Sequence, residues 1–329
     1  MNLRQENLFV ELSTGGDTAL LLASQKPYTE LLQSGVVPTL FPNHDREVPS
    51  NDREKPIVAI TAPPSNKDGL IGVRREVATA MRSLTPLIIH AGMEPALIAQ
   101  WLTQISGVVI PGGSDLSRYW FDSTPTASDE LQQQHDLLEL QLVAWALNNG
   151  IPVMGICRGF QVMATLAGYR VHDISSDAVH HTDEPQIYSA LLGASSIHPV
   201  TLLPAYSPLT THTTPPTVSP TQLLVNSMHH QGTTGDLNIH RRKIRDAVYL
   251  EPGVTFKIVG YSEDGVAEVG QFVRSNGGNN RTVGIGFQGH PEAAGHINAH
   301  PSLKQFHTLA FQQFIEAVMQ YSSASGIPQ

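Results

Sequence analysis

The 329-residue sequence contains a single cysteine, so it cannot form an internal disulfide bond. This excludes a disulfide-stapled scaffold and fits a reducing, cytosol-like compartment. No run of about 18 apolar residues is present, so the sequence predicts no membrane-spanning helix. The first residues, MNLRQENLFVEL, lack the apolar centre of a secretory signal peptide. We therefore expect a cytoplasmic protein that does not contact a membrane.

Basic residues are also scarce, with 20 Lys and Arg against 29 Asp and Glu and a formal net charge of −9. Proteins that hold nucleic acid through its phosphates are usually basic, at least locally. The one dense basic run covers residues 240–245 and is short. We expect no nucleic-acid partner and interpret this run as solvated surface. A contact for an acidic partner, such as a polyglutamate chain, is the alternative.

Residues 1–53 differ from the rest of the chain. They end in FPNHDREVPSNDREKP, a polar, turn-rich stretch that is typical of a linker. We predict an N-terminal extension over 1–53, which packs on the main domain or binds a partner protein. A single domain is predicted over 54–329. Hydrophobic residues make up 40% of the whole chain, which is enough for a sizeable core.

Short apolar runs and helix-like segments alternate from residue 55 onward. Strands are predicted at 56–60, 105–110, 151–156, 266–273 and 282–287, and helices at 74–84, 128–149, 158–167 and 302–321. Pro86 is expected to interrupt or restart the first helix. Such alternation predicts an α/β fold with a mostly parallel central sheet and helices on both faces.

The cysteine lies in GICRGFQ, between a predicted strand and a predicted helix. A sharp turn flanked by glycines at this place is typical of a nucleophile elbow, which lifts the side chain clear of the sheet. The helix behind Cys157 directs its N-terminal N–H groups at the sulfur and favours the thiolate. A buried, inert cysteine is the alternative interpretation.

A thiol nucleophile needs a base and a group that orients the base. His290 and Glu292 stand two residues apart after the apolar strand VGIGF and can fill these two roles. The glycine turn in PGGSD, at residues 111–115, also follows a strand and can present a backbone N–H to an oxyanion. Sites in parallel sheets gather at the carboxyl ends of strands, and all three segments are predicted at such ends.

The segments VVIPGGSD, IPVMGICRGFQ and VGIGFQGHPE, in this order and spacing, resemble the class I glutamine amidotransferase domains over roughly residues 55–320. The resemblance implies a flavodoxin-like fold and a triad of Cys157, His290 and Glu292. It also implies an oxyanion hole made by the backbone amides of Gly113 and Arg158. By the same resemblance, Gln161 occupies a position near the substrate.

Within that superfamily, VNSMHHQG at 225–232 resembles a segment of the stand-alone γ-glutamyl hydrolases of the peptidase C26 type. YSEDGVAEVGQF and SSIHPVTL resemble two further segments of these enzymes, which cleave compounds such as γ-glutamyl-γ-aminobutyrate. The resemblance implies that Asn226, Ser227 and His229 line the glutamyl pocket. A γ-glutamyl group carries an α-ammonium and an α-carboxylate, so hydroxyl, imidazole and amide partners suit it.

The sequence departs from the family where an aromatic residue usually precedes HPE, because Gly289 stands there. We expect this glycine to leave space beside His290 and to widen or loosen the site. Residues 293–295, AAG, also replace an aromatic, and residues 238–259 form a longer segment than the family's equivalent. These departures put the family's usual small substrate in doubt.

Several histidines raise the alternative of a metal site, among them residues 180, 181, 229, 230, 296 and 300. No HExxH motif and no second cysteine accompanies them, so we expect no metal and no cofactor. The predicted function is hydrolysis of a γ-glutamyl amide or isopeptide bond. A glutaminase subunit that serves a separate synthase and an inactive binding module remain alternatives, and a homodimer stays open.

Overall fold

The structure is a computed structural model that describes residues 55–62, 75–91, 93, 95–121, 130–174, 179, 181, 197–206, 209, 222–238, 241–276, 279–294 and 301–325. The predicted extension over 1–53 and the Thr/Pro-rich segment at 210–220 lie outside the described residues. The boundary between extension and domain therefore stays a prediction.

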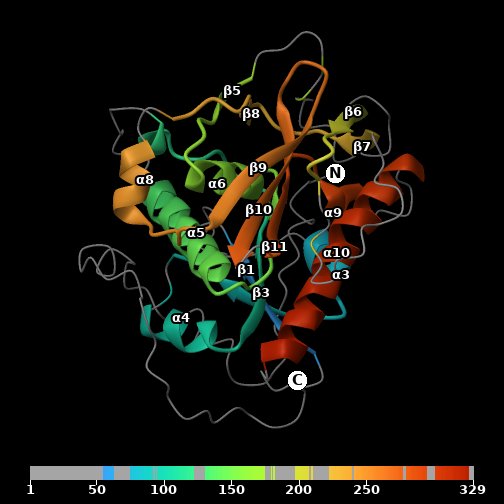
Figure 1. Ribbon diagram of the computed structural model, residues 1–329. Coiled ribbons are helices and arrows are strands. Elements are labelled where there is room, and N and C mark those ends of the chain that lie inside the picture. The colour runs from blue at the N-terminus through green and yellow to red at the C-terminus, as the bar shows by residue number, and fades with distance from the viewer. Residues whose placement is uncertain are drawn as a thin grey trace, which may run out of the picture.

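One nine-stranded sheet forms the centre of the molecule (Figure 1). Its parallel half has the order β2-β1-β3-β4-β11, which is the 2-1-3-4-5 order of flavodoxin-like folds. These strands are β2 (Thr85–Ile89), β1 (Ile57–Thr61), β3 (Ile105–Ile110), β4 (Val153–Ile156) and β11 (Asn279–Phe287). The predicted α/β class and flavodoxin-like parallel centre are confirmed.

Four antiparallel strands extend the sheet beyond β11, in the order β10-β9-β6-β7. They are β10 (Ala267–Asn276), β9 (Val254–Tyr261), β6 (Ile197–Leu202) and β7 (Gln222–Asn226). A separate short pair joins β5 (His172–Asp173) to β8 (Gln231–Gly232). Of the antiparallel extension, the sequence patterns predicted only β10.

Helices cover both faces of the sheet, as predicted (Figure 1). One face carries α4 (Pro95–Leu102), α5 (Glu130–Asn148), α6 (Arg158–Leu166) and α8 (Arg241–Ala247), with a short 3-10 turn at Arg118–Trp120. The other carries α3 (Arg75–Ala80), α9 (Pro291–Ala294) and α10 (Pro301–Ser325). Among the ranges described, no helix is long and apolar enough to cross a membrane.

The inner strands are apolar on both sides because each side meets a helical layer. Successive side chains of a strand point to opposite faces. Along β3, Val108 therefore joins the core under α5 and α6, whereas Val109 joins the core under α10. Gly107 lets α10 approach this strand closely, since a Cβ there would lie 2.5 Å from Val318 Cγ2.

The helix predicted over 74–84 is shorter in the structure, where α3 ends at Ala80. Pro86 does not restart it but lies in β2, opposite Val58 of β1. Proline lacks a backbone N–H and is tolerated in edge strands, and β2 is the edge of the sheet. The prediction went wrong here because a proline beside apolar residues fits both a helix break and an edge strand.

We expect the Phe314→Ala variant to lower the free energy of unfolding by about 3–5 kcal/mol, because it leaves a cavity between α10 and the sheet. Phe314 is fully buried in that core. Gln312→Ala, an exposed change two residues away on the same helix, is the matched control and is expected to stay within about 0.5 kcal/mol. Urea unfolding of the three proteins checks this, and equal losses in both variants would contradict the packing described.

Candidate active site

Cys157 lies at the sharp turn between β4 and α6, as the nucleophile elbow requires. Its φ of 52° and ψ of −105° make it the one non-glycine residue with positive φ in the part of the chain that is described. The Cys157 amide donates to the Phe287 carbonyl across 2.7 Å, and the Cys157 carbonyl accepts from the Gln161 amide at 3.1 Å. A strained backbone of this kind persists only where its surroundings hold it, and it is common at catalytic positions.

Gly155 and Gly159 allow α6 to lie close to the sheet at this turn. A Cβ on Gly159 would lie 2.0 Å from the Ile110 carbonyl oxygen, and one on Gly155 would lie 2.6 Å from the Gly159 carbonyl oxygen. Any side chain at either position would push the helix off the ends of β3 and β4. The glycines of GICRG are therefore required by packing around the turn, as well as by the turn itself.

His290 and Glu292 follow the end of β11 and form a buried pair with 2.7 Å between Nδ1 and Oε1. The PGGSD turn lies against His290 and Cys157, since a Cβ on Gly112 would lie 2.8 Å from His290 Cε1 and 3.5 Å from Cys157 Cβ. The structure thus brings together the three segments that the sequence singled out. A Cβ on Gly113 would lie 3.4 Å from Arg158 Cδ, so the two residues are neighbours, and the oxyanion hole formed by their backbone amides stays a prediction.

The charge state of His290 depends on its two neighbours. Burial lowers its pKa, but the Glu292 carboxylate and a charged Cys157 favour the imidazolium, and together they raise the pKa to about 10. With Nδ1 held by Glu292, the other ring nitrogen is left for proton exchange with the sulfur. A thiol, an imidazole and a carboxylate in this order are the side chains that a nucleophile, its base and the group that orients the base require.

Peptidase C26 is the family whose sequence profile matches this chain, over residues 56–292 and so over more than half of its length. The chain belongs to the peptidase C26 family. This membership supports a hydrolase of the glutamine-amidotransferase-like class.

Curated relatives agree with the family at low identity. A gamma-glutamyl-gamma-aminobutyrate hydrolase of Escherichia coli O157:H7 is 28% identical over 102 residues, which is 30% of this chain and 40% of the relative. Protein NtpR of Enterococcus hirae is 30% identical over 142 residues, or 42% and 54% of the two chains. The chain thus spans about half or less of the length of these relatives.

A solved glutamine amidotransferase of Thermotoga maritima aligns with 83% of this chain and 95% of its own, at 16% identity and a TM-score of 0.42. The assignment of the fold rests on the strand order in the sheet.

In this peptidase C26 domain, Arg158 anchors the turn that carries Cys157. Its buried guanidinium forms ion pairs with Asp136 and Glu139, which lie three residues apart on α5. Glu139 also accepts a hydrogen bond from Thr61 at 2.7 Å and contacts His135 at 3.1 Å. Burial raises the pKa of Glu139, but Arg158 and His135 outweigh burial and lower it to about 2. A continuous set of polar contacts therefore ties the residue after the nucleophile to α5 and β1.

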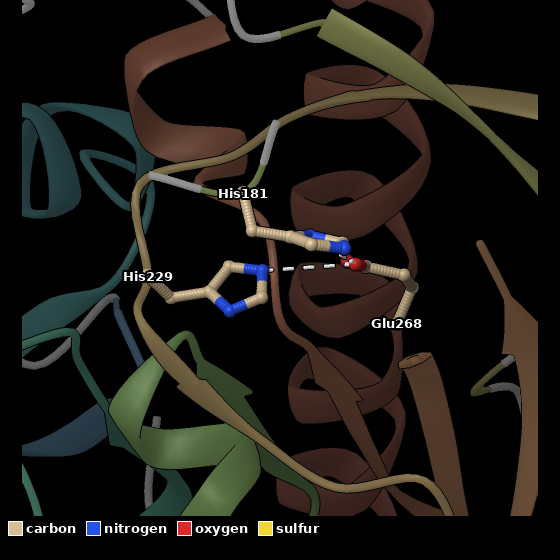
Figure 2. Close-up of side chains that lie close together, drawn as sticks. All are labelled: His181, His229 and Glu268. Carbon is tan, nitrogen blue, oxygen red and sulfur yellow. Dashed lines mark ion pairs between the residues drawn. The ribbon is translucent and has the colours of Figure 1, made fainter. Parts of the chain in front are cut away.

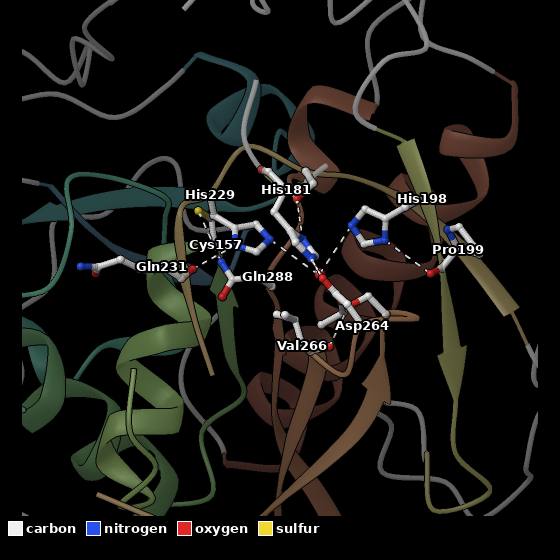
Figure 3. A network of polar contacts seen from close by, with 12 residues as sticks. Cys157, His181, His198, Pro199, His229, Gln231, Asp264, Val266 and Gln288 are labelled. Carbon is white, nitrogen blue, oxygen red and sulfur yellow. Dashed lines mark hydrogen bonds and ion pairs between the residues drawn. The ribbon is translucent and has the colours of Figure 1, made fainter. Parts of the chain in front are cut away.

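Gln288 is a further site residue that the sequence analysis missed. Its Nε2 donates to Cys157 Sγ at 3.8 Å (Figure 3). Its Oε1 lies 3.4 Å from Gln161 Nε2. The sequence feature that could have identified Gln288 is its position at the end of β11, immediately before Gly289 and His290. For the side chain of Arg158, a possible signal was the spacing of Asp136 and Glu139, which places two carboxylates on one side of α5.

The four predicted substrate residues are all buried, but they face two different places. Asn226 has both side-chain amide atoms without a hydrogen-bond partner among the described residues, and Gln161 has its Oε1 without one. Ser227 instead donates to the His181 carbonyl at 3.1 Å. His229 directs Nδ1 to the Gln231 carbonyl at 2.9 Å and Nε2 toward Glu268 at 3.6 Å. Their predicted contacts with substrate stay predictions.

Gly289 does not open the site, contrary to our expectation from the sequence. A Cβ at this position would lie 2.7 Å from the Asn226 carbonyl oxygen and 3.2 Å from Phe306. The space beside His290 is filled by the backbone of β7 and by α10, so the glycine is required by close packing. The substrate of the site stays a prediction, and residues 295–300, which include part of the second departure from the family, lie outside the described residues.

We expect Glu139→Gln to lower the free energy of unfolding by about 3–5 kcal/mol, because it leaves the buried Arg158 with one partner. Glu316→Gln on the exposed side of α10 is the matched control, for which we expect a change below about 0.5 kcal/mol. Urea unfolding measures the stability, and alkylation of Cys157 reports on the turn. Unchanged stability in Glu139→Gln would show that the ion pairs do not hold α6 in place.

The stability that His290 contributes should depend on pH. Because its pKa in the folded chain is raised above the ordinary value near 6.5, its contribution is complete below about pH 6.5 and is lost as pH rises through about 10. The difference in unfolding free energy between wild type and His290→Gln should therefore shrink between about pH 7 and pH 11. Urea unfolding across this range checks it.

The Glu292→Gln background provides the control for this pH dependence. Removing the carboxylate that raises the pKa of His290 should lower that pKa, so the stability that His290 contributes should be lost at lower pH. If the difference in unfolding free energy between wild type and His290→Gln were the same at every pH, that result would contradict an ion pair between His290 and Glu292.

Proposed function

We propose that this chain is a cysteine hydrolase that cleaves a γ-glutamyl amide or isopeptide bond. The observation that carries the proposal is the positive-φ turn at Cys157 next to the buried His290–Glu292 pair, in a chain of the peptidase C26 family. The substrate class comes from the relative named as a gamma-glutamyl-gamma-aminobutyrate hydrolase. A free thiol as nucleophile fits the proposed cytoplasmic location.

In the first half of the reaction, Cys157 Sγ forms a bond to the γ-carbonyl carbon while the thiol proton is held by His290. The carbonyl oxygen becomes an oxyanion, which accepts hydrogen bonds from the backbone amides of Gly113 and Arg158. The C–N bond then breaks, and His290 gives its proton to the leaving nitrogen. The products of this half are a free amine and a γ-glutamyl thioester.

In the second half, His290 takes a proton from a water molecule whose oxygen attacks the thioester carbonyl. The C–S bond breaks, glutamate leaves, and the proton on His290 returns to the sulfur of Cys157. Glu292 orients the imidazole and stabilises its positive charge in both halves, which is the part that the third member of a triad performs.

The glutamyl group is proposed to bind at Asn226 and Gln161. Asn226 offers Oδ1 to an α-ammonium and Nδ2 to an α-carboxylate, and both atoms lack partners among the described residues. Its backbone carbonyl lies against Gly289, directly before His290, which supports a place for Asn226 in the site. Leaving such buried polar atoms unpaired is costly, which favours a substrate that supplies their hydrogen bonds.

The test is glutamate release from a panel of γ-glutamyl compounds by wild type and by Cys157→Ala. The panel holds γ-glutamyl-γ-aminobutyrate, γ-glutamyl polyamines, folate polyglutamate, glutamylated peptides and free glutamine. We expect release from γ-glutamyl amides or isopeptides and a loss of roughly 10⁴-fold or more in Cys157→Ala. Asn226→Ala should lower kcat/KM by roughly 10- to 100-fold while Cys157 remains open to alkylation.

Other results point to the alternatives. Slow turnover of glutamine alone, accelerated by a partner from the source cells, would favour the glutaminase subunit. No turnover of any compound by a folded wild-type chain would overturn the hydrolase and leave a binding module.

A further inference from the structure

A buried cluster of histidines surrounds Glu268 (Figures 2 and 3). The proposed mechanism does not use this carboxylate. Glu268 lies on β10, His198 on β6, and His229 between β7 and β8. Glu268 Oε1 lies 3.4 Å from His181 Nδ1 and 3.6 Å from both His198 Nε2 and His229 Nε2. Three histidines from separate parts of the chain thus meet at one carboxylate oxygen of Glu268.

Hydrogen bonds at the outer ring nitrogens fix which atoms face Glu268. His229 Nδ1 lies 2.9 Å from the Gln231 carbonyl, and His181 Nε2 lies 2.9 Å from Asp264 Oδ2. Both partners are acceptors, so these nitrogens carry the hydrogen. In a neutral ring, the inner nitrogen then has only a lone pair. Two lone pairs therefore point at the carboxylate of Glu268.

Such an arrangement is repulsive unless something positive lies among these atoms. Neither oxygen of Glu268 has a hydrogen-bond partner among the described residues, and neither does His229 Nε2. The side chains of Glu268 and His229 are 0% and 1% exposed, so solvent does not compensate them. Buried polar atoms in native proteins are nearly always satisfied, and the unsatisfied ones indicate a missing ion or proton.

The spacing suits a metal ion. One nitrogen each from His181 and His229 and one oxygen from Glu268 lie within 4.8 Å of one another. Ligands bonded at about 2.1 Å to a tetrahedral ion lie about 3.4 Å apart. The 3.4 Å and 3.6 Å contacts to Glu268 Oε1 match that separation.

The outer contacts also match those of metal-binding histidines, which usually donate their second ring nitrogen to a carboxylate or a backbone carbonyl. Asp264 plays this part for His181 and is itself held by Ser262 Oγ at 2.6 Å. The Gln231 carbonyl plays it for His229. Two imidazoles and one carboxylate are a donor set that suits zinc and its transition-metal neighbours better than magnesium or calcium.

We propose that His181, His229 and Glu268 bind one divalent transition-metal ion of the zinc type, at a site separate from the catalytic triad. His198 Nε2 faces the same carboxylate oxygen from β6 and is the candidate for a fourth ligand. This proposal replaces the expectation from the sequence that the protein holds no metal. The sequence raised His181 and His229 as metal candidates but not Glu268, because the three ligands are 39 to 87 residues apart and match no metal motif.

The ion has a positioning role. The Gln231 carbonyl that holds His229 also accepts from Gln161 Nε2 at 2.8 Å. Gln161 contacts Gln288. Gln288 in turn donates to Cys157 Sγ (Figure 3). An ion bound to His229 therefore fixes the segment between β7 and β8, and through it the polar contacts beside the nucleophile.

The experiment measures metal on the purified full chain, after chelator treatment and dialysis against Zn²⁺. We expect one Zn²⁺ per chain in wild type and a higher Tm than in the metal-free chain, because binding to the folded state stabilises it. Glu268→Gln and His229→Ala should lose this ion. Glu263→Gln and His230→Ala, which change exposed neighbours of the same residue types, should retain it.

Asp264→Asn gives a graded result, since loss of an outer partner of a ligand should weaken Zn²⁺ binding by roughly 10- to 100-fold without abolishing it. Co²⁺ titrated into metal-free wild type should give the visible absorption of a four-coordinate nitrogen and oxygen site. That measurement needs no variant, so it decides the question even if Glu268→Gln fails to fold.

Wild type that retains no Zn²⁺ and gives no Co²⁺ spectrum would overturn the proposal, and so would equal Zn²⁺ content in folded Glu268→Gln. If Glu268→Gln also raised the stability of the metal-free chain, protons shared between Glu268 and the histidines would occupy the cluster in place of a metal ion. None of these readouts depends on turnover, so failure of the metal site and failure of the proposed hydrolase are distinguishable.

Discussion

A positive φ at Cys157 is the constraint on which the arrangement of the site depends. This conformation is unfavourable for a residue with a side chain, so its neighbours must hold it. The Phe287 carbonyl binds the Cys157 amide, and the buried ion pairs of Arg158 hold the next residue against α5. The strand, the turn and the helix are thus fastened on both sides of the nucleophile, and the sulfur lies at the carboxyl edge of the sheet.

The same packing explains where glycine is indispensable. Gly159 lies against the Ile110 carbonyl, and Gly289 lies against the Asn226 carbonyl. In both places two backbones meet without space for a methyl group. The first contact seats α6 on β3 and β4, and the second seats β7 beside the residue that precedes His290. Both contacts position side chains of the proposed active site through the backbone, and so with little freedom.

The antiparallel half of the sheet supplies more than an extension of the fold. β10 contributes Glu268, and the connection from β7 to β8 contributes His229, so the proposed metal site is built between strands of this half. Gln231, Gln161 and Gln288 link it by hydrogen bonds to the sulfur of Cys157. The residues of the proposed triad follow strands of the parallel half of the sheet. The residues of the proposed metal site lie on or beside strands of the antiparallel half.

Sequence by itself determined the parallel centre and pointed to the residues of the proposed triad, because both depend on local patterns. Continuous apolar runs marked β1, β3, β4 and β11, and GICRG and GHPE each place a reactive side chain directly after a strand. Only the tertiary structure decided which distant side chains meet. The partners of Arg158, the packing at Gly289 and the meeting of His181, His229 and Glu268 depend on the order of strands in the sheet. Residues this far apart leave no periodic signal, since the contacts that join them form only when the layers pack.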